Sequence, residues 1–171
     1  MIHIYYGDGK GKTTAAIGLA SRAAGSRMKV LFVQFLKTEF SGERHTLSHT
    51  ENITLSFVPI DLKFTFDMDE AEKAKAASLF RKIFNDSVTK VFTEKFDMIV
   101  LDEIFSAIET DMISEHDVYE FVSNAPKNLE IVMTGHNPPE RLLQLSDYIT
   151  EMKKIKHPYD KGISARFGIE F

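Results

Sequence analysis

The fold is decided by the stretch Gly7-Asp8-Gly9-Lys10-Gly11-Lys12-Thr13-Thr14. It follows the apolar run 2–6 and opens the alanine-rich run 13–24, which is the strand–loop–helix context of a phosphate-binding loop. Glycines let backbone N–H groups approach phosphate oxygens closely, and the helix start adds unpaired donors and partial positive charge. Lys12 then supplies an ammonium beside the phosphates, and the Thr13 hydroxyl supplies a ligand for Mg²⁺. The competing interpretation is a glycine-rich turn that binds nothing.

One position departs from the strict phosphate-loop pattern. That pattern places a glycine five residues before Gly11. Here Tyr6 occupies that position and Gly7 follows one residue later. We therefore expect the entry of the loop to be shaped differently, which changes how a triphosphate lies on it. The predicted phosphate-binding residues are Gly7, Asp8, Gly9, Lys10, Gly11, Lys12, Thr13 and Thr14.

Short apolar runs alternate with helical patterns along the rest of the chain. The apolar runs predict strands over 2–6, 29–36, 53–58, 98–101, 129–133 and 148–155. Helices are predicted over 13–24, 69–95 and 114–122, and after Pro138 or Pro139. In the longest helix the apolar stripe comprises Ala76, Phe80, Ile83, Phe84, Val88, Val91 and Phe92. Such alternation predicts an α/β fold: a single P-loop NTPase-like domain over 1–171, with a mostly parallel sheet flanked by helices.

Composition excludes several classes of function. The chain has 171 residues, 21 Lys and Arg against 25 Asp and Glu, and a net charge of −4. A mildly acidic balance argues against broad nucleic-acid or membrane-surface binding. No apolar run approaches the length of a membrane span, and no signal peptide is visible. With no cysteine there is no disulfide, thiolate metal site or cysteine nucleophile, which fits a reducing cytoplasm.

Asp102 and Glu103 end the apolar strand 98–101. Ligands of a parallel sheet gather at the carboxyl ends of its strands. If this strand lies beside the first one, the two carboxylates point near Thr13, and one of them would hold Mg²⁺, directly or through water. Alone, such a pair caps the next helix or faces solvent about half of the time. The second carboxylate could instead activate water, which leaves open an ATPase or an ATP-dependent regulatory switch with Glu103 as the base.

Several stretches together resemble the P-loop-type cob(I)alamin adenosyltransferases. They run almost from end to end of the chain: 7–16, Val33-Gln34-Phe35-Leu36-Lys37, Gly42-Glu43-Arg44, 100–104, Thr134-Gly135, 156–163 and 168–171. The resemblance implies transfer of the 5′-deoxyadenosyl group of ATP to the Co(I) of a reduced corrinoid, giving adenosylcobalamin and triphosphate. It also implies ATP bound in reverse, with the ribose C5′ toward cobalt. Lys12 and a Mg²⁺ held by Thr13 and Glu103 would stabilise the charge on the leaving triphosphate.

The resemblance also assigns a role to the segment Phe64-Thr65-Phe66-Asp67. Family members use an aromatic loop there to displace the lower axial ligand of the corrinoid, commonly with tryptophan where Phe66 stands. Without the resemblance, Phe64 and Phe66 fit better as core residues of a strand end beside Phe57. The family further implies ATP, Mg²⁺ and corrinoid as ligands, a cytoplasmic homodimer and a flavoprotein reductase as partner. Its usual arginine after Thr134-Gly135 is His136 here.

Overall fold

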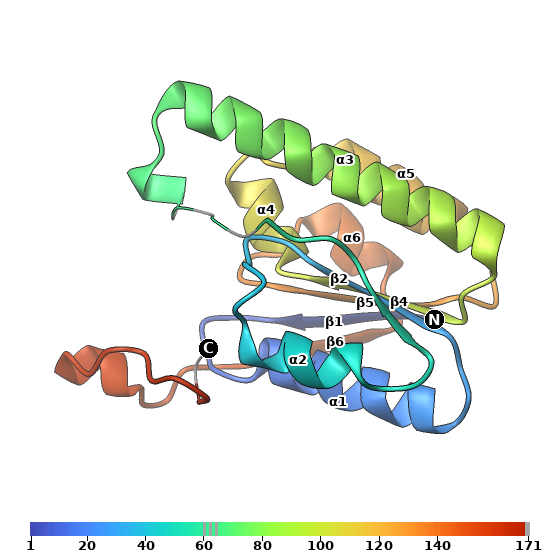
Figure 1. Cartoon of the computed structure of the whole chain (residues 1–171), viewed down its shortest axis with the longest axis horizontal. Helices are drawn as coiled ribbons and strands as arrows, with labels where there is room; N and C mark the ends of the chain where they lie inside the picture. The colour runs from blue at the N-terminus through green and yellow to red at the C-terminus, as the bar shows by residue number, and fades with distance from the viewer. Residues whose placement is uncertain (60, 62, 64, 170–171) are drawn as a thin grey trace.

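The computed structural model describes residues 1–59, 61, 63 and 65–169, and for Phe66 the backbone alone. Its centre is a parallel sheet with strand order β3-β2-β4-β5-β1-β6 (Figure 1). The strands are β1 (Ile2–Tyr6), β2 (Val30–Gln34), β3 (Ile53–Leu55), β4 (Met98–Asp102), β5 (Glu130–Gly135) and β6 (Tyr148–Glu151). All strands point the same way, so every loop at their carboxyl ends reaches the same edge of the sheet.

Helices cover both faces of this sheet (Figure 1). On one face lie α1 (Lys12–Gly25) and α2 (Gly42–Ser48). On the other face lie α3 (Glu70–Glu94), α4 (Ile104–Glu109), α5 (Glu115–Asn124) and α6 (Glu140–Leu145). Two short 3₁₀ turns, η1 (Thr65–Asp67) and η2 (Pro158–Lys161), complete the elements in the described ranges. The predicted α/β architecture is therefore confirmed.

Strand alternation divides the core between the two faces. On β4, Met98 and Val100 pack toward the alanine stripe of α1, whereas Ile99 and Leu101 pack toward α3 and α5. Small alanines let α1 pack close to the strands, and Phe80 and Phe84 of α3 fill the core on the opposite face. Burial on both faces explains why β2 and β4 read as continuous apolar runs.

The longest helix begins and ends close to its predicted bounds. Asp69 is its N-cap and accepts from the backbone of Glu72, whose side chain bonds back to the N-cap in a capping box. Phe92 departs from the predicted stripe, because its side chain is 53% exposed near the end of the helix. At the end of α1 the helix continues through Gly25, and Arg27 rather than the glycine adopts positive φ (67°).

Three sequence predictions are corrected by the structure. The third strand is short: β3 ends at Leu55, well before Pro59. Strand β5 lies between β1 and β4, so the acidic strand is not the neighbour of the first one. Helix α4 was not among the predicted helices; it begins at Ile104, directly after Glu103, which takes the left-handed conformation. Strand β6 covers only the first half of the run 148–155.

Candidate nucleotide site

The phosphate loop joins the end of β1 to the first turn of α1. Gly11 is the N-cap of α1 and takes the left-handed conformation (φ 117°), which favours glycine. Lys12 begins the helix and is only 8% exposed, with its Nζ donating to the Gly9 carbonyl at 2.9 Å. The buried ammonium is thus held inside the curve of its own loop, where it can meet a phosphate.

Two glycines of the loop are required by packing against the chain that follows β6. An added Cβ on Gly9 would lie 2.5 Å from the Met152 carbonyl oxygen and 2.9 Å from the Lys153 carbonyl carbon. On Gly7, at φ 111°, it would lie 2.6 Å from the same oxygen. The backbone N–H of Gly9 donates to that oxygen at 2.6 Å, and the N–H of Gly7 donates to the His136 carbonyl. The loop is therefore shaped by its neighbours as well as by its own sequence.

The C-terminal tail is tied to the same loop. A carboxylate oxygen of Asp8 accepts from the backbone N–H of Lys154 at 2.9 Å, and this bond lowers the pKa of Asp8. Lys10 Nζ donates to the Ile169 carbonyl at 2.9 Å. Two of the predicted phosphate-binding residues, Asp8 and Lys10, thus also hold the tail at the loop.

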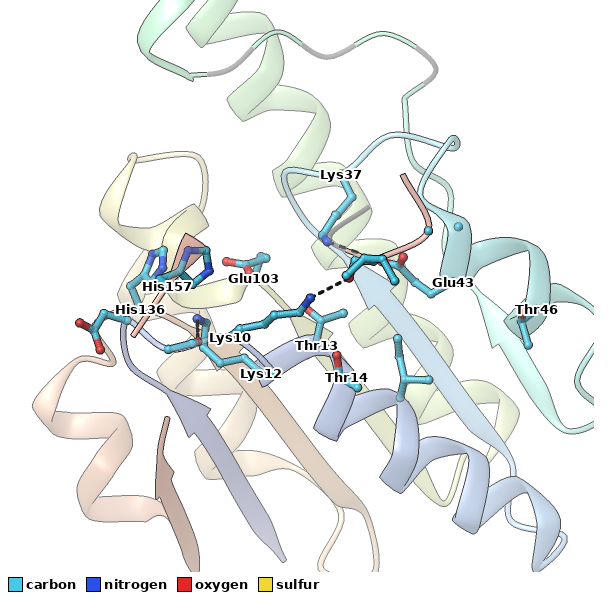
Figure 2. A pocket seen from close by; sticks show the side chains of 17 residues that line it. Lys10, Lys12, Thr13, Thr14, Lys37, Glu43, Thr46, Glu103, His136 and His157 are labelled. Carbon is cyan, nitrogen blue, oxygen red and sulfur yellow. Dashed lines mark hydrogen bonds and ion pairs between the residues drawn. The ribbon is translucent and has the colours of Figure 1, made fainter. Parts of the chain in front are cut away.

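A cavity of about 610 Å³ opens over the loop (Figure 2). Lys12, Thr13 and Glu103 all line it. Lys37 and Glu43 flank it on one side, and His136 and His157 on the other (Figure 2). The remaining lining residues are Asp8, Gly9, Lys10, Gly11, Thr14, Ile17, Gly42, Thr46, Gly168 and Ile169. Except for Gly7, every predicted phosphate-binding residue therefore lines one cavity.

Asp102 faces the first turn of α1 across the sheet edge. One oxygen, Oδ1, accepts from the Thr13 hydroxyl at 2.9 Å and from the Thr134 hydroxyl at 2.8 Å. The other, Oδ2, accepts from Gln34 Nε2 at 3.2 Å. Burial raises the pKa of this carboxyl. Thr13 lies on α1, and this helix contacts β4 as well as β1 and β5, so Thr13 meets Asp102 although β1 and β4 are not neighbours.

Glu103 takes the left-handed conformation (φ 60°) at the start of α4. For a residue other than glycine this conformation is strained, and such strain concentrates at functional sites. The Glu103 N–H donates to the Thr134 hydroxyl at 2.9 Å, and its carboxylate accepts from Ser106 at 2.6 Å. Gly135 is needed beside this turn, because an added Cβ would lie 2.6 Å from Cβ of Phe105.

The donor set fits a magnesium ion that is shared with a phosphate. Because the Thr13 hydroxyl donates its hydrogen bond to Asp102, its lone pairs stay free for a cation, and Glu103 presents a carboxylate to the same cavity. Within the described ranges, no three His, Asp or Glu side chains form a group that could hold a metal alone. Mg²⁺ commonly takes one or two protein ligands and fills its shell with phosphate and water.

The structure places only part of the predicted aromatic segment. Phe64 and the side chain of Phe66 lie outside the described residues. The backbone over Thr65–Asp67 forms a 3₁₀ turn, and Phe57 is 64% exposed. The predicted strand does not reach this segment, because β3 ends at Leu55, and the alternative that Phe64 and Phe66 are core side chains falls outside the described residues.

Sequence reasoning missed how other residues build the site. Gln34 is fully buried and joins Asp102 to Glu43, and Thr134 bridges Asp102 and Glu103. Arg44 donates to Gln34 at 3.0 Å. A usable signal existed: Gln34 and Thr134 are polar residues inside otherwise apolar strands. Such residues seldom lie buried without hydrogen-bond partners.

A glycine loop before a helix, a buried lysine and a Thr–Asp hydrogen bond at the carboxyl edge of a parallel sheet define a P-loop nucleotide-binding protein. The family model "ATP:corrinoid adenosyltransferase BtuR/CobO/CobP" matches residues 1–171. The chain belongs to this family and is a corrinoid adenosyltransferase.

Characterised relatives are similar over the full length of the chain. It is 32% identical to the corrinoid adenosyltransferase of Escherichia coli (strain K12), covering 100% of this chain and 85% of the relative. It is 32% identical to the enzyme of the same name from Sinorhizobium sp, covering 100% and 80%. It is 31% identical to the corrinoid adenosyltransferase CobA of Salmonella typhimurium, covering 100% and 85%. Across the described helices, none has the length and hydropathy needed to cross a membrane.

Proposed function

We propose that the cavity binds ATP with its phosphates on the loop 7–14 and its ribose C5′ turned toward a reduced corrinoid. The corrinoid cobalt, as Co(I), attacks C5′ with its electron pair. A Co–C bond forms, the C5′–O bond breaks, and the electrons of that bond leave with triphosphate. Cobalt is formally oxidised from Co(I) to Co(III), so no external oxidant is needed. The observation that carries the proposal is that Lys12, Thr13 and Glu103 line a single cavity.

The chain supplies charge and position for this reaction, and the corrinoid supplies the nucleophile. Negative charge grows on the triphosphate as the C–O bond breaks. Backbone N–H groups of the loop and the Lys12 ammonium meet that charge where it develops, which stabilises the transition state more than the bound substrate. No protein nucleophile or general base is required, so Glu103 serves as a metal ligand in this proposal.

Thr13 and Glu103 are the residues proposed to hold Mg²⁺ at the phosphates. When bound, the ion neutralises phosphate charge. Asp102 takes no direct ligand position, because its two oxygens already accept from Thr13, Thr134 and Gln34. Asp102 accepts the hydrogen bond of the Thr13 hydroxyl and so orients the lone pairs of the threonine oxygen toward the cavity.

Phe64 and Phe66 are proposed to displace the lower axial ligand of the corrinoid. The resulting four-coordinate Co(II) is easier to reduce, and a flavoprotein reductase is the proposed electron donor. Because ATP and low-potential electrons are both available there, we place the reaction in the cytoplasm. The absence of cysteine from the sequence is consistent with that compartment.

We further propose a homodimer. Strand β6 lies at one edge of the sheet and is exposed along its whole length. Tyr148 and Ile149 on this strand are 53% and 47% exposed. An edge strand with exposed apolar side chains invites pairing with another chain. Light scattering across a concentration series, repeated with Ile149→Lys, tests the proposal: the substitution is expected to shift the mass toward that of one chain.

One assay separates adenosyl transfer from the ATPase alternative. The purified protein is incubated with ATP, Mg²⁺ and chemically reduced cobalamin, and both the corrinoid spectrum and the phosphate products are followed. Transfer predicts an alkylated corrinoid and triphosphate in equal amounts, and neither product when Co(I) is omitted. Release of orthophosphate without corrinoid would instead support an ATPase with Glu103 activating water.

A further inference from the structure

A continuous path of hydrogen bonds leaves the nucleotide site and ends on the backbone of Ser56. It begins with Thr13 and Asp102, and passes from Asp102 to Gln34 (3.2 Å). Arg44 Nη1 donates to Gln34 Oε1 at 3.0 Å, and its Nη2 donates to the Ser56 carbonyl at 2.8 Å. Residue 56 follows β3, and the chain continues from there to Phe64 and Phe66. The path therefore joins the nucleotide cavity to the start of the proposed corrinoid-contacting segment.

The Gln34 amide can adopt only one orientation in this path. Its Nε2 donates to two carboxylates, Glu43 at 3.0 Å and Asp102 at 3.2 Å, and its Oε1 accepts from Arg44, which can only donate. A flipped amide would set its oxygen against both carboxylates and its NH₂ against the guanidinium. Gln34 is fully buried, so water cannot compensate for such a mismatch. The amide thus links β2 to β4 and α2 through hydrogen bonds in one fixed orientation.

Arg44 is a second such link, and it holds three elements together. From α2, its guanidinium reaches the end of β2 through Gln34 and the end of β3 through Ser56. Its two bonds use different nitrogens of one planar group, which a lysine ammonium cannot reproduce with the same fixed angles. Glu43, the preceding residue, lines the nucleotide cavity and pairs with Lys37 at 3.5 Å. Neither Gln34 nor Arg44 lines the cavity itself.

We propose that Gln34 and Arg44 are positioning residues that fix where the segment after Ser56 starts relative to the nucleotide site, and thereby set the affinity for the corrinoid. This inference rests on the proposed function, in which that segment contacts the corrinoid. Arg44 acts mainly on the corrinoid side, because one of its two bonds holds Ser56. Gln34 acts on both substrates, because it also holds Glu43 and Asp102.

The test compares Arg44→Met and Gln34→Met with the wild-type enzyme, using chemically supplied Co(I). Arg44→Met is expected to raise KM for cobalamin about tenfold, the effect of losing a charged hydrogen bond, and KM for ATP less than about twofold. Gln34→Met is expected to raise both KM values. Arg44→Lys keeps the charge without the fork and should recover part of the cobalamin KM. Arg22→Met changes an exposed arginine on α1 and is the matched control, with both KM values unchanged.

The outcomes separate this inference from the proposed function. If wild-type enzyme forms no alkylated corrinoid, the proposed function fails. If the wild type is active and Arg44→Met leaves KM for cobalamin unchanged, or raises both KM values equally, the positioning role is wrong. An equal rise together with a lower Tm would indicate a purely structural arginine. Should Arg44→Met not fold, Arg44→Lys decides: an unchanged cobalamin KM in that variant overturns the inference.

Discussion

The phosphate loop and the opposite wall of the cavity are shaped by different kinds of contact. Around the loop, Gly7 and Gly9 press against the backbone at Met152, and main-chain bonds set the curve. Across the cavity, side chains set the shape instead: Asp102, at the end of β4, accepts hydrogen bonds from Thr13 on α1, Gln34 on β2 and Thr134 on β5. Backbone-built walls tolerate changes of side chain but no added Cβ. A wall built from hydrogen-bonded side chains is instead disrupted when one partner is removed, because the remaining buried polar group is left unpaired.

The largest effect is expected at Lys12, the one buried cation of the loop wall. Lys12→Ala removes the ammonium that meets the leaving triphosphate. We expect kcat for adenosyl transfer to fall about a hundredfold or more, measured spectrally at saturating ATP. Lys75→Ala, on the exposed side of α3, is the matched control. Unchanged turnover in Lys12→Ala would remove that lysine from the chemistry.

Glycine substitutions probe the backbone-built wall directly. In Gly9→Ala the new Cβ meets backbone atoms of Met152 and Lys153, which cannot rotate away. We expect a loss of about 2–4 kcal/mol in the free energy of unfolding, together with weak ATP binding. Gly18→Ala, exposed on α1 with no atom within 4 Å of the added Cβ, is expected to stabilise the protein by about 0.5–1 kcal/mol. Equal effects of the two substitutions in chemical denaturation would contradict the packing argument.

The aromatic segment 64–67 belongs to neither wall of the cavity and is proposed to contact the corrinoid. Phe66→Ala is expected to slow transfer about tenfold when the reaction starts from Co(II) and a reductant, since an apolar contact with the corrinoid is lost. With chemically supplied Co(I) the loss should be about twofold. Phe92→Ala removes an exposed phenylalanine of α3 and serves as the control. Equal losses in the two assays would argue against displacement of the axial ligand.

The smallest effect is expected where Asp8 ties the tail to the loop. The Lys154 N–H lowers the pKa of Asp8 below its ordinary value of 3.8. A lowered folded-state pKa means that this carboxylate stabilises the fold above the unfolded pKa, and that the contribution is lost as pH falls through the folded pKa. Asp8→Ala should lower Tm by about 1–3 °C at pH 7, with the difference shrinking as the pH falls below the ordinary pKa of 3.8. A difference that persisted in acid would point to another cause.

The contrast between the two walls also explains how much of the site could be predicted from the sequence. The strand–loop–helix unit was predicted correctly because its residues are consecutive, and the phosphate-binding role of the loop stays a prediction. Asp102 and Glu103 were both predicted to point near Thr13 on the premise of adjacent strands; β5 in fact intervenes, and Asp102 makes the contact. The roles of Gln34 and Arg44 were not predicted, since their partners lie on other elements. Helix α4 was missed because it begins after a strained Glu103 that no sequence pattern marks.

By itself, the sequence determined the strand–loop–helix unit at 2–24, the parallel α/β class and the resemblance that names the chemistry, because each of these depends on neighbouring residues or on ordered motifs. Only the tertiary structure decided which atoms complete the site. Thr13 and Asp102 are 89 residues apart, and Lys154 reaches Asp8 across 146 residues. Such contacts depend on strand order and on backbone packing between distant segments, and neither is written in the spacing of residues along the chain.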